Sequence, residues 1–136
     1  MDIEEQIKIT LGKAVEIHKQ FGPGLVERFY EVLLYRELKR SGLRVSRQVP
    51  VSLEYKGELH SNIFRMDILL DRTAIIEIKS SRYMSPLFCQ QLLTYLKASN
   101  LQIGIVLNFG QLRMKDGIKR VVNGYKQTVD DSLSNI

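Results

Sequence analysis

The sequence has very little cysteine and no long apolar stretch. Its single cysteine, Cys89, excludes an intramolecular disulfide and a cysteine-rich zinc site. No apolar run approaches the roughly 18 residues that a membrane-spanning helix needs. The first residues, Met1 to Glu5, are acidic, whereas a signal peptide would be basic and then apolar. We therefore expect a soluble, cytoplasmic protein that has no membrane partner.

Internal repeats, low-complexity segments and linkers are missing too, and a chain of 136 residues fits one domain. We expect this domain to span residues 1–126 and residues 127–136 to form a frayed C-terminal tail. Hydrophobic residues make up 44% and charged residues 26% of the chain, as in an ordinary globular domain. Such a chain can bury a substantial core without disulfides or a structural metal.

The spacing of apolar residues predicts the order of helices and strands. Apolar residues four apart predict two helices, and Gly22-Pro23-Gly24 must separate them. Ser85 and Pro86 have the residue types that cap and open a third helix, ending near Ser99. Alternating or continuous apolar segments predict strands. The predicted strands are 49–55, 63–70, 74–79 and 102–107, with short edge strands at 112–114 and 120–122.

This order predicts an α/β fold. Three antiparallel strands and a further strand after a crossover helix would form a mixed β-sheet, with the helices packed on it. No domain boundary interrupts that order.

Positive charge is modest in total but concentrated in two stretches. The formal net charge is +5, and the stretches Arg28–Arg47 and Gln111–Lys126 each carry a net charge of +4. Two such stretches can attract the phosphates of a nucleic acid. The alternative is a pair of solvated faces that bind nothing.

Two neighbouring predicted strands carry charged residues between their apolar ones. A three-residue loop between them places Asp67 opposite Glu77 and Arg65 opposite Lys79. Because facing carboxylates destabilise a sheet, this pair calls for a cation such as Mg²⁺, which prefers oxygen ligands. Lys79 would then orient an attacking water or neutralise charge on a phosphate. The alternative is a solvent-facing hairpin in which Arg65 and Lys79 balance the two acids.

Two predicted helices carry further polar residues near this hairpin. Gln91 and Tyr95 are four residues apart and share one face of the third helix. They could position a nucleotide or a water, or they could be core groups bonded to the backbone. Glu27, at the edge of the second helix's apolar stripe, could complete a metal site, or it could be an acid favoured by the helix dipole.

Taken together, these residues resemble the PD-(D/E)XK nuclease superfamily, and more closely the small prokaryotic proteins of the GxxExxY family. The GxxExxY motif is Gly24 to Tyr30, the nuclease signature is Asp67 with Glu77-Ile78-Lys79, and Gln91 to Tyr95 resembles the Gln-x-x-x-Tyr element. Met66 stands where the superfamily's name has proline. The resemblance implies a restriction-endonuclease-like core.

The resemblance also assigns roles to residues. It implies a metal site made by Asp67, Glu77 and the backbone carbonyl of Ile78, and a catalytic Lys79. Glu27 would be the helix acid, and Gln91 and Tyr95 accessory residues of the same catalytic site. We expect the basic residues that hold the nucleic-acid backbone to be Arg65, Arg113, Lys119 and Arg120.

The function expected from all of this is that of a metal-dependent phosphodiesterase, a nuclease that uses Mg²⁺ or Mn²⁺. DNA is favoured over RNA as the substrate, and a homodimer or a partner protein would enlarge the small surface for gripping it. The alternative is a catalytically silent module for nucleic-acid binding or assembly on the same scaffold.

Overall fold

The computed structural model describes residues 1–124, and it opens with two helices joined by a tight break. Helix α1 spans Ile3–Phe21, and its first turn is capped by Asp2, which accepts a hydrogen bond from the Glu5 N–H at 2.8 Å. Helix α2 spans Glu27–Arg40. Gly22 and Gly24 between them have φ angles of 69° and 101°, a region that favours glycine. The predicted break is therefore confirmed.

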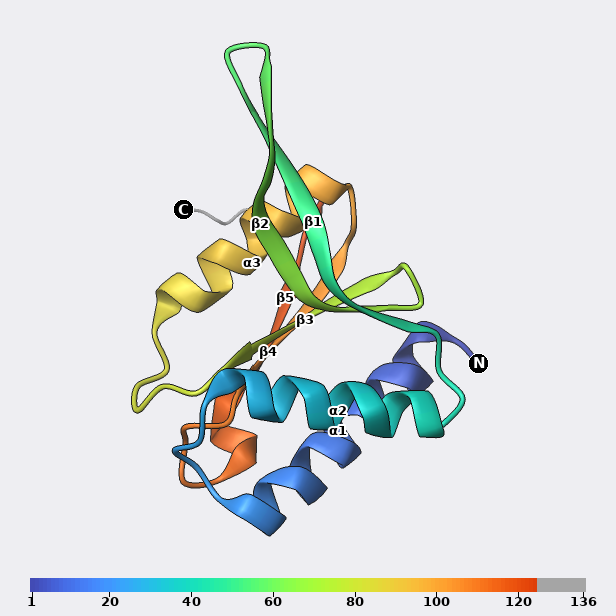
Figure 1. Ribbon diagram of the computed structural model, residues 1–136, viewed down its shortest axis with the longest axis vertical. Coiled ribbons are helices and arrows are strands. Elements are labelled where there is room, and N and C mark those ends of the chain that lie inside the picture. Colours follow the sequence, from blue (N-terminus) through green and yellow to red (C-terminus); the bar gives the residue numbers. More distant parts are fainter. Residues whose placement is uncertain (125–136) are drawn as a thin grey trace.

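A five-stranded mixed sheet follows, in the order β1-β2-β3-β4-β5. Strands β1, β2 and β3 form an antiparallel meander, β4 runs parallel to β3, and β5 is antiparallel to β4 (Figure 1). Helix α3 makes the crossover between β3 and β4. The expected α/β class is thus confirmed. The bounds are β1 Val45–Tyr55, β2 Glu58–Leu70, β3 Ala74–Lys79, α3 Pro86–Ser99, β4 Ile103–Asn108 and β5 Ile118–Val122.

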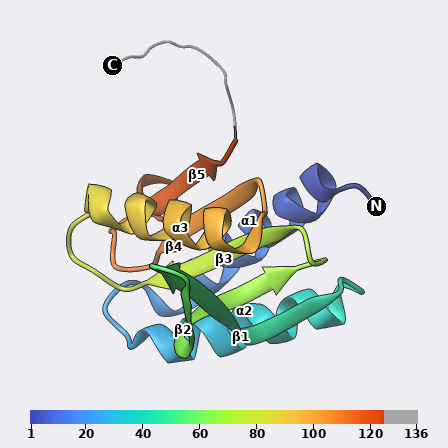
Figure 2. The same cartoon turned by 90° about the horizontal axis from the view of Figure 1, so that it is seen from above.

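Helices cover both faces of the sheet, and each face has its own apolar cluster. The first cluster joins α1 and α2 to sheet residues such as Ile76 and Ile105, and the second joins α3 to their neighbours Ile75 and Val106. Successive strand residues point to opposite faces of the sheet, so Ile75 and Ile76 belong to different clusters. The helices that pack on these clusters therefore form separate layers. Figure 2 shows α3 on one side of the sheet and α2 on the other. Strands covered on both faces explain the nearly continuous apolar sequence of β3 and β4.

Local signals predicted α3 well, whereas some strand limits were wrong. Ser85 caps α3 by accepting the Leu87 N–H at 3.1 Å, and Pro86 begins the helix. The predicted edge strand at 112–114 is not one, because a 3₁₀ turn occupies Met114–Gly117. The predicted strand at 120–122 is part of β5, and the predicted tail 127–136 lies outside the described residues. Within residues 1–124, no helix has the length and apolar character to cross a membrane.

The first two strands are longer than predicted and are irregular. Together they form a hairpin whose far end extends beyond the rest of the molecule (Figure 1). The regular pairing shifts between Val51 and Leu53, and Gln48 and Asn62 have φ angles of 53° and 63°. Such bulges bend a strand and increase its twist. Because β1 pairs only with β2, it is one edge of the sheet, and this edge also contains Pro50.

Candidate active site

The centre of the candidate site is the point where β2 and β3 separate. The predicted register is confirmed for three pairs, from Leu70–Ala74 to Ile68–Ile76, and the ladder then ends. Asp67 and Glu77 are the next residues on the two strands, so the sheet brings them together as expected. The predicted pairing of Arg65 with Lys79 is wrong, because the ladder between β2 and β3 ends before it reaches these residues.

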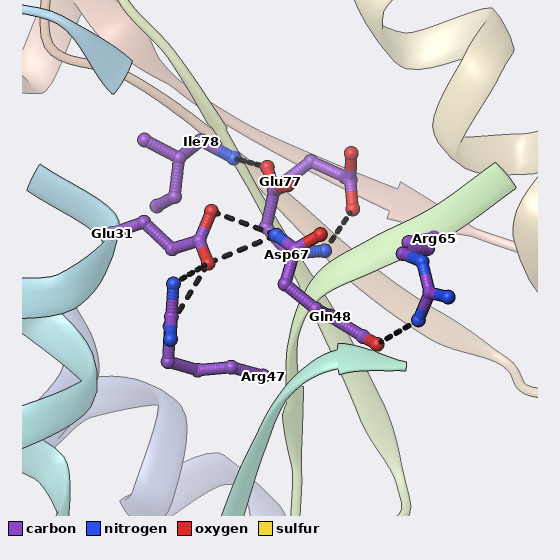
Figure 3. A network of polar contacts seen from close by, with 7 residues as sticks. All are labelled: Glu31, Arg47, Gln48, Arg65, Asp67, Glu77 and Ile78. Carbon is purple, nitrogen blue, oxygen red and sulfur yellow. Dashed lines mark hydrogen bonds and ion pairs between the residues drawn. The ribbon is translucent and has the colours of Figure 1, made fainter. Parts of the chain in front are cut away.

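The two carboxylates do not simply face each other, because each binds the main chain of the other strand. The Asp67 N–H donates to Glu77 Oε2 at 2.9 Å, and the Ile78 N–H donates to Asp67 Oδ2 at 2.8 Å (Figure 3). The side chains therefore replace the ladder hydrogen bonds that the separating strands give up. This arrangement satisfies buried main-chain groups and fixes the orientation of both acids.

Burial makes it unfavourable for these acids to be charged. Only 4% of Glu77 is exposed. Desolvation, and to a smaller extent the charge of Asp67, raises the pKa of Glu77 to about 8. Burial also raises the pKa of Asp67 to about 6, with further contributions from the carboxylates of Glu31 and Glu27. Within residues 1–124, neither carboxylate forms an ion pair with a basic side chain.

Lys79, Gln91 and Tyr95 form a chain of hydrogen bonds beside the acids. Lys79 Nζ donates to Gln91 Oε1 at 2.8 Å, and Gln91 Nε2 donates to the Tyr95 hydroxyl at 3.3 Å. Tyr95 is buried, and its pKa is raised by desolvation and by the negative charges of Glu77 and Asp67. The structure thus brings the polar pair on α3 to the end of β3, where Lys79 lies.

A further acid, Glu31, was not singled out by the sequence. It is buried on α2, where it accepts hydrogen bonds from Arg47 Nε at 3.0 Å and from Gln48 Nε2 at 3.0 and 3.1 Å. Figure 3 places this group beside Asp67, and the charge of Glu31 raises the pKa of both Asp67 and Glu77. The available signal was its position four residues after Glu27, which puts both acids on one helix face.

Glu27 lies at the outer limit of this group. It is exposed at the first residue of α2, and its charge contributes less to the raised pKa of Asp67 than that of Glu31 does. Of the two acids on α2, Glu31 is therefore the stronger electrostatic neighbour of Asp67.

The four basic residues predicted to bind nucleic acid are spread over separate elements, with Arg113 just before the 3₁₀ turn. Arg65 is near the site, and its guanidinium donates to the Gln48 carbonyl at 2.9 Å. Lys119 and Arg120 are in β5, and two strands separate them from β2. Arg120 binds Glu4 with one bond of 3.0 Å, and Arg113 binds Asp116 at 3.2 Å.

The donor chemistry of the site fits a hard divalent cation with few protein ligands. In residues 1–124, no three His, Cys, Asp or Glu side chains gather into a complete metal centre. Over the same residues, one oxygen of Asp67 and one of Glu77 remain without a hydrogen bond. Magnesium binds through one or two carboxylates and completes its shell with other oxygens, so this pair is sufficient for it.

Comparisons with known proteins agree with this geometry. The chain is similar to the crystal structure of SSO0001, with 18% sequence identity over 90% of this chain and a TM-score of 0.55. It spans 63% of that chain, and at this identity the likeness bears on the fold, which is restriction-endonuclease-like. No curated protein matches the chain. The family model described as the PD-(D/E)XK nuclease superfamily matches residues 4–121. The chain therefore belongs to the PD-(D/E)XK nuclease superfamily.

Proposed function

We propose that the protein is a metal-dependent nuclease that hydrolyses phosphodiester bonds of DNA. The observation that carries the proposal is the neighbouring pair of half-buried Asp67 and buried Glu77, which have no basic partner among residues 1–124 and lie where β3 ends at Lys79. Two acids with raised pKa values beside a lysine are typical of a catalytic site rather than of a structural one. Nucleases of this superfamily generally use divalent metals.

Asp67 and Glu77 would hold Mg²⁺ or Mn²⁺, with the main-chain carbonyl of Ile78 as a third ligand. When bound, such an ion screens the charge of a phosphate and lowers the pKa of a water that attacks phosphorus. The main-chain hydrogen bonds to both acids keep one oxygen of each in place. The protein therefore has little reorganisation to make when the cation and the substrate bind.

Lys79 would assist the attack on the phosphate. Gln91 holds its ammonium at 2.8 Å, and Tyr95 in turn bonds Gln91. From this position the ammonium can orient a water or neutralise charge on a phosphate oxygen. Glu27 would add a carboxylate from α2, at the rim of the same site.

Basic residues would hold the DNA backbone without reading sequence. Arg65 is close to the acids, whereas Arg113, Lys119 and Arg120 would contact more distant phosphates, the two arginines after exchanging their present acidic partners. A second copy of the chain or a partner protein would enlarge this surface. The motif from Gly24 to Tyr30 further supports a place in the GxxExxY family.

Cleavage of a mixed panel of substrates tests the proposal. The panel holds supercoiled plasmid, linear duplex, single strands and a four-way junction, each with Mg²⁺, Mn²⁺ or EDTA. We expect metal-dependent products whose rate falls at least about 100-fold in Lys79→Ala, as for the loss of a general acid–base group. Lys97→Ala, which changes an exposed lysine on α3, should cut like wild type.

The opposite result would favour the silent binding module. If wild type and Lys79→Ala give the same products on every substrate, those products come from a contaminant. If neither protein gives products, the protein does not cut these substrates. Retained, salt-dependent binding of DNA would then identify a nucleic-acid-binding scaffold.

A further inference from the structure

The loop that leaves the candidate active site presents an exposed aromatic ring. Tyr83 is 71% exposed and lies between β3 and α3, four residues after Lys79. Since a chain advances at most about 3.6 Å per residue, the Cα atoms of these two residues are no more than about 14 Å apart. A ligand that contacts Tyr83 can therefore extend to the catalytic lysine.

Two side-chain amides, one buried and one half-buried, hold this loop in one conformation. Asn108 is fully buried, accepts the Ser81 N–H at 2.9 Å and donates to the Tyr83 carbonyl at 3.2 Å. Gln111 donates to the Arg82 carbonyl at 2.9 Å. The tyrosine ring is thus exposed on a fixed backbone, which reduces the entropy lost when a ligand binds to it.

A cavity of about 480 Å³ lies between this loop and the segment that follows β4. This volume is within the range of small-ligand sites. Its lining combines an aromatic ring, an apolar side chain, a cation and polar groups. The lining residues are Arg82, Tyr83, Gly110, Gln111, Leu112 and Asp116.

The charges around this cavity suit a ligand with a phosphate. Arg82 is exposed, lies 5.9 Å from the centre of the Tyr83 ring and forms no ion pair within residues 1–124. Asp116 contributes an acid, but its carboxylate is engaged by Arg113 at 3.2 Å. An exposed ring beside an available guanidinium matches the two parts of a nucleotide, because rings stack on bases and arginine binds phosphate.

We propose that this cavity binds one unpaired nucleotide next to the scissile phosphate, a specificity that rests on the nuclease function proposed above. Tyr83 stacks on the base and Arg82 contacts its phosphate. A base inside a duplex is covered on both faces by its neighbours, so it cannot stack on Tyr83 without leaving the helix. The preferred substrates are therefore single strands and duplexes with single-stranded extensions, rather than uninterrupted duplex.

Binding measured in EDTA tests the cavity while no strand is cut. The probe is a single strand that contains 2-aminopurine, whose fluorescence falls when the base stacks, with a fully paired duplex for comparison. We expect Tyr83→Ala to raise the Kd for the single strand about 5- to 100-fold, as for the loss of one stacked base. Tyr83→Phe, which keeps the ring, should retain binding.

Tyr55 provides the matched control. It is 68% exposed and has a lysine 5.5 Å from its ring centre, but it lies near the far end of the β1–β2 hairpin. Tyr55→Ala should leave both Kd values unchanged. The proposal is overturned if Tyr83→Ala leaves binding of the single strand unchanged, or if it weakens binding of single strand and duplex equally.

Cleavage distinguishes a failure of this proposal from a failure of the nuclease function. With Mg²⁺ or Mn²⁺, we expect wild type to cut an extended duplex faster than a closed one, and Tyr83→Ala to reduce that preference at least about fivefold. An unchanged preference in Tyr83→Ala refutes the nucleotide site but leaves the nuclease. If wild type cuts no substrate, the nuclease function fails, and the binding titration alone decides whether the cavity holds a nucleotide.

Discussion

Replacing Glu77 by glutamine should remove a large pH dependence of stability. Burial and the Asp67 charge raise the pKa of Glu77 from 4.5 to about 8. Between these values the folded protein keeps a proton that the unfolded chain releases. The stabilisation of the folded protein by this retained proton is therefore fully present below pH 4.5 and is lost as the pH rises through about 8. Without metal, the free energy of unfolding should fall across this interval.

The size of the effect follows from the same values. At roughly 1.4 kcal/mol for each pH unit, a change in pKa from 4.5 to about 8 corresponds to a loss of about 5 kcal/mol. Asp67, whose pKa is raised from 3.8 to about 6, adds a loss of the same sign at lower pH. Such losses are large against a total stability of about 5 to 15 kcal/mol. Glu77→Gln has no charge to bury, and its amide oxygen can still accept the Asp67 N–H.

The free energy of unfolding is measured by urea denaturation, monitored by circular dichroism, in EDTA at about pH 5.5, 7 and 8.5. Glu4 and Asp71 do not contribute in this range, because hydrogen bonds lower the pKa values of both carboxyls. We expect wild type to lose several kcal/mol and Glu77→Gln to lose clearly less. Glu54→Gln, which changes an exposed acid, should follow wild type. A wild-type stability that is constant or rises towards pH 8.5 would refute the reasoning.

Adding Mg²⁺ extends the same experiment to the proposed cation. A ligand that binds only the folded state stabilises it, by about 2.7 kcal/mol at one hundred times its Kd. Wild type at pH 8.5 should therefore recover stability, whereas Glu77→Gln should recover little. Equal gains in both proteins would mean that Glu77 does not bind the cation.

Four further substitutions test the packing of the protein, each by urea denaturation. Glu31→Ala should cost about 3 kcal/mol because it leaves Arg47 without its buried partner; a loss below about 1 kcal/mol would show that the pair is dispensable. Gly110→Ala should destabilise the protein by about 1 to 3 kcal/mol, since the added Cβ would lie 2.2 Å from the Ser81 carbonyl oxygen. Gly12 on α1 has open space around the position of a Cβ, so Gly12→Ala should stabilise the protein by up to about 1 kcal/mol. Leu92→Ala, which empties a fully buried position under α3, should cost about 2 to 5 kcal/mol; a smaller cost would mean that the helix collapses onto the sheet.

The sequence predicted features that depend on neighbouring residues. The cap residue Ser85 and the proline Pro86 favour a helix start through local geometry, and the loop between β2 and β3 is short enough to fix the register of their first pairs. The approach of Asp67 to Glu77 follows from that register. The Gln91–Tyr95 contact follows from helical spacing alone.

Features that depend on tertiary structure were missed. Nothing local indicates that β2 and β3 separate after Ile68, or that each carboxylate then accepts a main-chain N–H of the other strand. Glu31 likewise looks like an ordinary helix acid until the start of β1 brings Arg47 and Gln48 against it. These contacts join residues 10 to 17 positions apart, and their geometry is set by packing rather than by a motif.

The irregular edge at β1 also bears on how the protein behaves at high concentration. A straight edge strand has unpaired main-chain groups that can pair with the edge of another molecule and begin an aggregate. Here Pro50 has no N–H to offer, and the positive φ of Gln48 interrupts the extended backbone close beside it. The bend at Gln48 that directs its carbonyl to Arg65 thus also protects the sheet from growing by intermolecular β-pairing.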